Sequence, residues 1–314
     1  MKNDTNNCPS CKSSSINLLE SINIHDLDKL YKCGFNYSVR ELFSEMSSID
    51  FCQCKKCDLR YFTPMVAGTQ EFYEYFQNFD WYYFDDKPEF LFAKEYIKDD
   101  DDVLEIGAGK GAFSKIISTM RYTGLEFSQN AIEVANKNGV NLISQSIEDY
   151  SKTNNNKHDV VCNFQVLEHV CDVNSFLKSS IRCLKPGGTM IISVPSVDSF
   201  SRYVRNFTLD MPPHHLTRWT DLALRNIANE YGMKMVELHH EVLQEPHKLF
   251  YASTIFENAL FSMVGKAHKN VDLGVLTRVI KKLSSILGNI FSKGLASNDL
   301  LPRGISTVAV YQKI

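Results

Sequence analysis

The sequence predicts an α/β fold in which a mostly parallel sheet is covered by helices on both faces. From about residue 102 onward, short apolar runs alternate with longer segments of helical periodicity. Glycine-rich turns at 107–111 and 186–188 separate some of these segments. Parallel strands must be joined by crossovers, so this alternation requires helices packed on both faces of one sheet.

Seven strands are expected, in the ranges 102–106, 121–126, 140–144, 160–164, 189–194, 235–242 and 305–312. Helices are predicted at 111–120, 129–138 and 173–183. A further amphipathic helix should begin near Thr220, whose hydroxyl makes it a good N-cap. Ligands of such folds collect at the carboxyl ends of the strands, so the functional residues are sought there.

A glycine turn follows the first predicted strand. Gly107, Gly109 and Gly111 let the backbone approach a ligand closely, because no Cβ stands in the way. Glu126 ends the next apolar run, about 20 residues on, where an acid can accept both hydroxyls of an adenosine ribose. Together these residues predict a site for a nucleoside cofactor.

The identity of the nucleoside depends on charge. Gly107, Gly109 and Ala112 also satisfy Gly-x-Gly-x-x-Ala, with which a dinucleotide fold would hold a pyrophosphate. Glu105 is expected within this turn, where its negative charge would repel a pyrophosphate. The same charge suits S-adenosylmethionine (SAM), which carries an ammonium and a sulfonium, so SAM is favoured over a nicotinamide dinucleotide.

The second half of the domain carries a family resemblance. Residues 158–170 read His-Asp-Val-Val-Cys-Asn-Phe-Gln-Val-Leu-Glu-His-Val, and 184–195 read Leu-Lys-Pro-Gly-Gly-Thr-Met-Ile-Ile-Ser-Val-Pro. Over roughly residues 89–245 the chain resembles the class I SAM-dependent methyltransferases. The resemblance implies a Rossmann-like sheet that is parallel except for one antiparallel strand, with 235–242 and 305–312 side by side.

The resemblance also implies which residues contact SAM. Family members often place an acidic or polar side chain after the third strand against the adenine amino group. Glu148 is the candidate here, with Ile147 packing on the ring, although the family more commonly has Asp in this loop. The expected cofactor-binding residues are Glu105, Gly107, Ala108, Gly109, Gly111, Glu126, Phe127, Ile147, Glu148, Asn163 and Phe164.

Two Cys-x-x-Cys pairs precede this domain, formed by Cys8, Cys11, Cys54 and Cys57. Each pair can present two thiolates from a tight turn, and two pairs complete a tetrahedral site that suits structural Zn²⁺. Free thiols are the alternative, and Cys33 or Cys52 could replace a ligand. The long spacer between the pairs is expected to carry a helix at 39–46.

The order of these features also resembles bacterial methyltransferases of saccharide biosynthesis, including zinc-containing C-methyltransferases that act on deoxysugar nucleotides. The aromatic stretch 72–84 is either a lid over the substrate or packing between the zinc region and the core. The expected division is a zinc-binding region at 1–66, an aromatic linker or lid with a lead-in helix at 67–98, a SAM-binding core at 99–248, a helical insertion at 249–299 and a final core strand at 300–314.

Methyl transfer requires the enzyme to align the acceptor and exclude water, with a base when a hydroxyl or acidic carbon is methylated. His214 and His215 follow two prolines, which should hold them at the cleft mouth, where either could accept a proton near neutral pH. Packing or loop capping is their alternative role, and His169 is a competing base. Glu168 and His169 could instead bind a divalent ion, as the similar motif does in ubiquinone-type O-methyltransferases.

Composition limits the partners. The chain has 314 residues, 44% hydrophobic and 23% charged, and its net charge of −3 gives no reason to expect nucleic acid. No transmembrane segment is expected, and a reducing, cytoplasmic location fits the cysteines. The apolar stripe of 276–291 would suit a lid, a core helix, a homodimer or a membrane surface.

The sequence therefore predicts a SAM-dependent methyltransferase that modifies oxygen or carbon of a small polar acceptor, with a saccharide or nucleotide sugar as the leading class. The alternatives are an RNA methyltransferase that uses its zinc region for nucleic acid and a SAM-binding protein without turnover.

Overall fold

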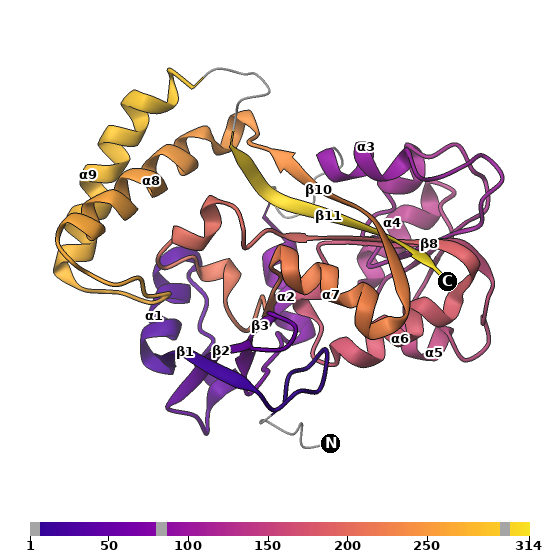
Figure 1. Ribbon diagram of the computed structural model, residues 1–314, viewed down its shortest axis with the longest axis horizontal. Helices are drawn as coiled ribbons and strands as arrows, with labels where there is room; N and C mark the ends of the chain where they lie inside the picture. The colour runs from indigo at the N-terminus through magenta and orange to yellow at the C-terminus, as the bar shows by residue number, and fades with distance from the viewer. Residues whose placement is uncertain (1–6, 80–86, 296–301) are drawn as a thin grey trace.

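The computed structural model describes residues 7–79, 87–295 and 302–314, and two sheets organise them (Figure 1). The larger sheet has seven strands in the order β10-β11-β8-β7-β4-β5-β6. Its strands are β4 (Val103–Ile106), β5 (Tyr122–Leu125), β6 (Leu142–Ile143), β7 (His158–Phe164), β8 (Leu184–Pro195), β10 (Met233–Val242) and β11 (Arg303–Lys313). Strands β8, β7, β4, β5 and β6 run parallel, while β11 is antiparallel to both β8 and β10. The predicted Rossmann-like sheet is confirmed.

Helices cover both faces of this sheet. On one face lie α3 (Pro88–Lys94) and α4 (Gln129–Lys137), and on the other lie α5 (Ile147–Tyr150), α6 (Val173–Cys183) and α7 (Asp221–Tyr231). Helix α6 buries Val173, Phe176 and Leu177, whose spacing puts them on one helical face. This burial of apolar faces against the sheet is what the alternating sequence pattern predicts.

The smaller sheet is antiparallel and has the order β1-β2-β3-β9, with bounds Ile16–Asn23, Ser48–Cys54, Arg60–Thr63 and Thr217–Arg218. Helices α1 (Ile24–Phe35) and α2 (Gln70–Gln77) pack beside it, burying Tyr31, Phe72 and Phe76 completely. Strand β9 comes from the segment that follows β8, so the N-terminal region and that distant segment share one sheet. This pairing was not predicted.

Three local predictions are wrong. The helix expected at 111–120 is a single 3-10 turn, Phe113–Lys115, because Gly111 has φ +75° and the β-branched residues that follow disfavour a helix. The helix expected at 39–46 is also one 3-10 turn, Arg40–Phe43, and the helix of the spacer is α1, which Asn23 caps. The turn expected at 186–188 is an irregularity inside β8, where the register to β7 shifts.

Helices α8 (Lys248–Met263) and α9 (Val275–Ser292) form a hairpin that extends from one end of the molecule (Figure 1). A Cβ on Gly288 would lie 2.2 Å from Ser253 Oγ, so glycine allows the two helices to cross closely. Much of the predicted apolar stripe is at the surface, at Leu276, Val279, Leu283, Ile286, Ile290 and Phe291. A contact surface on α9 stays a prediction. None of the described helices has the length and apolar character needed to cross a bilayer.

Candidate cofactor and acceptor site

The glycine turn lies at the carboxyl end of β4. Gly107, Gly109 and Gly111 have φ values of +73°, +54° and +75°, a conformation that side chains rarely adopt. A Cβ on Gly107 would lie 2.4 Å from Cγ2 of Val166, so the loop after β7 packs directly against this turn. The turn therefore places bare backbone between the ends of β4 and β7.

Glu126 follows β5, and its hydrogen bonds connect the loops that follow β4 and β5. Its Oε2 accepts a hydrogen bond from the backbone N–H of Gly109 at 2.8 Å. Its Oε1 accepts from the backbone N–H groups of Phe127 and Ser128, both at 2.8 Å. A carboxylate has about four lone-pair positions, so the anchored group can still accept a ligand hydroxyl. The ring of Phe127 beside it is 71% exposed.

Asn163 is the most informative residue at this edge. It lies in β7 next to Ile106 of β4 and is completely buried. Within the described chain, neither its amide nitrogen nor its amide oxygen has a hydrogen-bond partner. An unpartnered buried polar group costs about 1–3 kcal/mol, so a polar ligand that supplies the missing bonds fits this position. The glycine turn, Glu126 and Asn163 together fit a nucleoside cofactor.

Other expected cofactor residues lie beneath this edge. Glu105 belongs to β4 and not to the turn, and its carboxylate accepts a hydrogen bond from the Tyr122 hydroxyl. Burial raises the pKa of Glu105 to about 8. Phe164 packs against Phe90 and Phe113, with ring centroids 4.8 and 4.7 Å away. Ala108 and Ile147 are also buried in apolar clusters.

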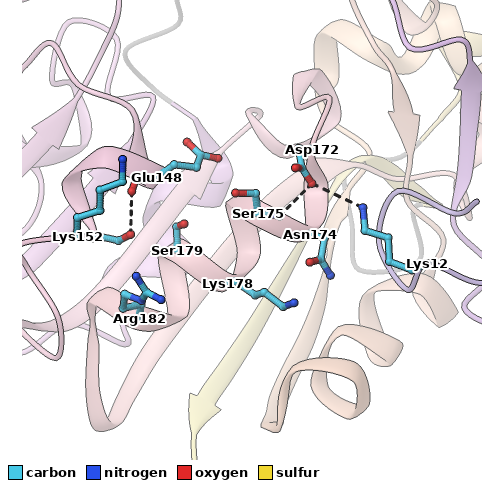
Figure 2. A pocket seen from close by; sticks show the side chains of 10 residues that line it. Lys12, Glu148, Lys152, Asp172, Asn174, Ser175, Lys178, Ser179 and Arg182 are labelled. Atoms are coloured by element: carbon cyan, nitrogen blue, oxygen red, sulfur yellow. Dashed lines mark hydrogen bonds and ion pairs between the residues drawn. The ribbon is translucent and has the colours of Figure 1, made fainter. Parts of the chain in front are cut away.

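Glu148 lies elsewhere. It is half-buried on α5 and lines a surface hollow of about 410 Å³ between α5 and α6, together with Lys152, Ser175 and Arg182 (Figure 2). An ion pair of 3.8 Å between Lys12 and Asp172 lies at the same hollow. No residue of the glycine turn lines it. A contact between Glu148 and an adenine amino group stays a prediction.

The three candidate histidines come together beside the loop that touches the glycine turn. The 3-10 turn Leu167–His169 follows β7, and its Glu168 carbonyl accepts a hydrogen bond from the N–H of Leu216 at 2.7 Å. His169 Nδ1 bonds to the carbonyl oxygen of His214 at 2.6 Å. One ring nitrogen from each of His169, His214 and His215 lies within 4.8 Å of the others. We call these histidines with Glu168 the His/Glu cluster.

Burial controls the charges in the His/Glu cluster. Desolvation raises the pKa of Glu168 to about 7, and only 1% of the residue is exposed. Desolvation also lowers the pKa of His169 to about 3 and that of His214 far below its usual value, with neighbouring imidazoles adding to the effect. The sequence predicts His214 at the mouth of a cleft, and this prediction is wrong. His214 is buried against Phe72 and Phe76, because α2 covers it.

Asp210 and Tyr73 also contact the His/Glu cluster, and neither was among the predicted site residues. Asp210 Oδ1 lies 3.0 Å from Nδ1 of His215. The ring of Tyr73, on α2, meets the His169 ring edge-on at 5.8 Å. The spacing of Asp210 five residues before His215 was a usable signal. Phe72 and Phe76 of the aromatic stretch thus belong to the apolar core of the N-terminal region. Tyr73 of the same stretch faces the His/Glu cluster. Residues 80–84 lie outside the described residues.

The four predicted zinc ligands are also brought together. The Sγ atoms of Cys8 and Cys57 are 3.5 Å apart, as are those of Cys11 and Cys54, and all four lie within 4.8 Å of one another. Tetrahedral zinc with Zn–S bonds of about 2.3 Å separates its sulfurs by about 3.8 Å, so the arrangement fits this ion. Cys33 and Cys52 are outside the group.

The cysteine turns rest on the core. Thr220 donates a hydrogen bond to Asp58 Oδ2 at 2.6 Å, directly after the second cysteine pair. Asn226 Nδ2 and the Tyr231 hydroxyl, both on α7, donate to the carbonyl oxygens of Cys57 and Ser10. A metal at these turns would therefore brace α7 and the segment that precedes it.

The fold and the strand-end residues define a nucleoside-cofactor-binding α/β protein. Residues 70–238, more than half of the chain, match the model of the methyltransferase domain family, and the chain belongs to this family. It is 34% identical over 110 residues to a probable S-adenosylmethionine-dependent methyltransferase of Mycolicibacterium smegmatis, covering 32% of this chain and 40% of the relative. It is also 34% identical over 116 residues to a ubiquinone biosynthesis O-methyltransferase of Vibrio atlanticus, covering 34% of this chain and 46% of the relative.

Each match thus spans less than half of these curated relatives. A solved SAM-dependent methyltransferase from Archaeoglobus fulgidus is similar at 18% identity, with 72% of this chain and 91% of that chain covered and a TM-score of 0.46.

Proposed function

We propose that the protein transfers a methyl group from SAM to an oxygen or carbon of a small polar acceptor. One juxtaposition carries the proposal. The cofactor edge at Gly107 and the loop that leads into the His/Glu cluster touch through Val166, so a methyl donor and an acceptor would meet there. Alignment of two reactants in a site closed to water is the main requirement of methyl transfer.

Residues of this chain would divide the work. SAM supplies a methyl group that its sulfonium charge already activates. Glu126 would hold the ribose hydroxyls, Asn163 would bond to a polar group of the cofactor, and the glycine turn would present its backbone to it. On the acceptor side, the His/Glu cluster would orient the acceptor and receive or release its proton, as any hydroxyl or acidic carbon requires. Helix α2 would shield the acceptor from water.

The acceptor class is the finer part of the proposal. The ubiquinone biosynthesis O-methyltransferases among the relatives act on oxygen by name, which favours oxygen here. A saccharide or nucleotide sugar is the leading acceptor, supported by the paired cysteines, aromatic stretch and SAM domain in the order seen in saccharide-biosynthesis enzymes. RNA is disfavoured by the net charge of −3.

Formation of S-adenosylhomocysteine in the presence of a cell metabolite extract tests turnover. We expect it to persist after nuclease treatment of the extract and to be lost when small molecules are removed. Binding of SAM without product under all these conditions would leave a SAM-binding protein and would contradict the proposed transfer.

The cofactor half is tested separately at Glu126. Glu126→Ala should weaken SAM binding by about 1.5–3 kcal/mol, the usual loss when a charged hydrogen-bond partner is removed. This corresponds to a dissociation constant about 10- to 150-fold higher, measured by calorimetry. Glu133→Ala, which removes an exposed carboxylate from α4, is the matched control. An unchanged dissociation constant for Glu126→Ala would refute the role of Glu126.

The acceptor half is tested at the histidines. His214→Ala or His215→Ala should lower turnover about 100-fold or more and leave SAM affinity nearly intact, because these residues lie on the acceptor side. Near-normal turnover in both variants, together with its loss in His169→Ala, would instead assign the essential group to the turn after β7.

A further inference from the structure

A second cavity lies between the smaller sheet and the segments that follow β8 and α8, and it has a volume of about 60 Å³. Three arginines line it together with one carboxylate, namely Arg60, Arg202, Arg218 and Asp210. We call it the arginine pocket. The lining residue Phe51 is buried, whereas 40% of the Arg202 side chain is exposed, so the pocket opens to solvent beside Arg202. A single water needs roughly 10–15 Å³ of such space, so the pocket has room for a group of several heavy atoms.

The guanidinium of Arg60 lacks a counter-ion that bonds to it. Arg60 is half-buried, and within the described residues its buried Nε has no hydrogen-bond partner. Burial also lowers the pKa of Arg60. The carboxylates of Asp58 and Asp198 lie in its surroundings, but each bonds to another residue. Asp58 accepts a hydrogen bond from the Thr220 hydroxyl, and Asp198 accepts one from the N–H of Asp221. A partly buried charge without such a bond is unfavourable, so an anion fits beside Arg60.

Strand pairing places a second guanidinium next to Arg60. Arg60 of β3 lies directly opposite Arg218 of β9, so both side chains are on one face of the smaller sheet. The charge of Arg218 is compensated, because its Nε lies 2.8 Å from Asp210 Oδ2 and its Nη1 donates to Asn270 Oδ1 at 2.6 Å. Like charges directly opposite each other destabilise a sheet, and an anion between them would relieve the repulsion.

Asp210 connects the arginine pocket to the His/Glu cluster. Its Oδ2 pairs with Arg218, while its Oδ1 lies 3.0 Å from Nδ1 of His215. A single carboxylate thus separates the arginine pocket from the histidines that the proposed function places beside the acceptor. A small acceptor held at the pocket by one end would reach the His/Glu cluster with the other.

We propose that the arginine pocket binds a phosphate group of the methyl acceptor. The role of the acceptor rests on the proposed function, whereas phosphate binding itself does not depend on it. Guanidinium groups bind phosphate through paired N–H groups. Arg60, Arg218 and Arg202 come from β3, β9 and the 3-10 turn Phe200–Tyr203, so they reach the cavity from three elements. This arrangement suits the tetrahedral oxygens of phosphate better than a planar carboxylate.

The arginines also have donors to offer. Arg202 lies 3.9 Å from the Asp198 carboxylate, which is too long for a hydrogen bond, so this contact leaves its N–H groups able to bind a ligand. A neutral acceptor would leave Arg60 without a counter-ion, whereas a phosphorylated one would supply it. The pocket would therefore select phosphorylated acceptors over neutral ones.

Thermal unfolding of the full chain in inorganic phosphate, against chloride at equal ionic strength, tests the pocket. Phosphate should raise the unfolding midpoint of the wild-type protein in a saturable manner. Half-saturation should need about 10- to 150-fold more phosphate in Arg60→Gln and in Arg202→Gln, because each loses a charged hydrogen-bond partner. Arg278→Gln, which removes an exposed arginine from α9, is the matched control and should respond as the wild type does. Equal responses of all four proteins, or none in the wild type, would overturn the proposal.

SAM calorimetry on each variant reports whether the core is intact. Arg202 lies at the exposed rim of the pocket, so Arg202→Gln carries the test if Arg60→Gln does not fold.

Turnover with the metabolite extract tests whether the phosphate belongs to the acceptor. Inorganic phosphate should then inhibit the wild-type protein in competition with the extract, and prior digestion of the extract with phosphatase and phosphodiesterase should abolish turnover. Saturable phosphate binding with turnover that neither treatment lowers would overturn the assignment to the acceptor and leave a site for free phosphate. Absence of S-adenosylhomocysteine formation in a chain with the expected phosphate response would instead count against the proposed function alone.

Discussion

The hydroxyl of Thr220 makes two interactions at the junction between the cysteine turns and the core. It caps α7 by accepting a hydrogen bond from the N–H of Ala223 at 3.0 Å. It also donates to Asp58 Oδ2 at 2.6 Å, and only 2% of the residue is exposed. Thr220→Val keeps the shape of the side chain and removes both interactions. Loss of an N-cap costs about 0.5–2 kcal/mol and loss of a hydrogen bond to a charged group about 1.5–3 kcal/mol.

Because one hydroxyl makes both bonds, the sum of roughly 2–5 kcal/mol is an upper range for the loss of unfolding free energy. Urea denaturation of the metal-loaded protein measures it, and Thr220→Ser, which retains the hydroxyl, should change stability by much less. Asp58 would keep its bond from Gln53, so Asp58→Asn combined with Thr220→Val in a double-mutant cycle isolates the shared bond. A loss below about 0.5 kcal/mol for Thr220→Val would refute this account of the junction.

Two further variants test other parts of the structure. Cys8→Ser should remove one zinc per chain and destabilise the N-terminal region more than it lowers SAM affinity, as elemental analysis and calorimetry would show. No metal in protein purified without chelator would contradict this. Folding raises the pKa of Glu105 from 4.5 to about 8, so the folded chain holds a proton that the unfolded chain has lost between these values. Its contribution to stability therefore falls as pH rises through that window, and Glu105→Gln should flatten the decline in urea-unfolding free energy between pH 5 and pH 8, measured without SAM.

The sheet was predictable because its signals are local. Strand β4 and most of β7 are short, largely apolar runs, at Val103–Ile106 and 160–164, and helix α6 has the predicted bounds because its apolar spacing is regular. The wrong helix at 111–120 shows the limit of pattern alone. Its apolar residues have helical spacing, but Gly111 and the β-branched residues after it weaken helix propensity, and packing of Phe113 on Phe90 and Phe164 fixes a single turn.

The candidate site was predictable only in part, because only some of its residues carry a local sequence signal. Gly107, Glu126 and Asn163 lie at strand ends, so topology alone predicts that they share an edge. Glu168 lies beside His214 and His215 because the backbone of Leu216 bonds to that of Glu168. These residues are far apart in the sequence, and no periodicity predicts that they meet. The charge environment also needed the structure, because burial by α2 is what lowers the pKa of His214.

The position of β9 explains why a structural metal region would matter to chemistry at a distance. Tyr61 of β3 pairs with Thr217 of β9, and the N–H of Phe62 donates to the carbonyl of Leu216. Leu216 in turn donates to the carbonyl of Glu168, so the strand that follows the second cysteine pair fixes both halves of the His/Glu cluster. Loosening the cysteine turns should therefore displace the acceptor side while Glu126 and Asn163, on the main sheet, keep their places. A metal at the cysteines would act on catalysis through alignment of the acceptor, which is why we expect turnover to respond to its loss more than SAM affinity does.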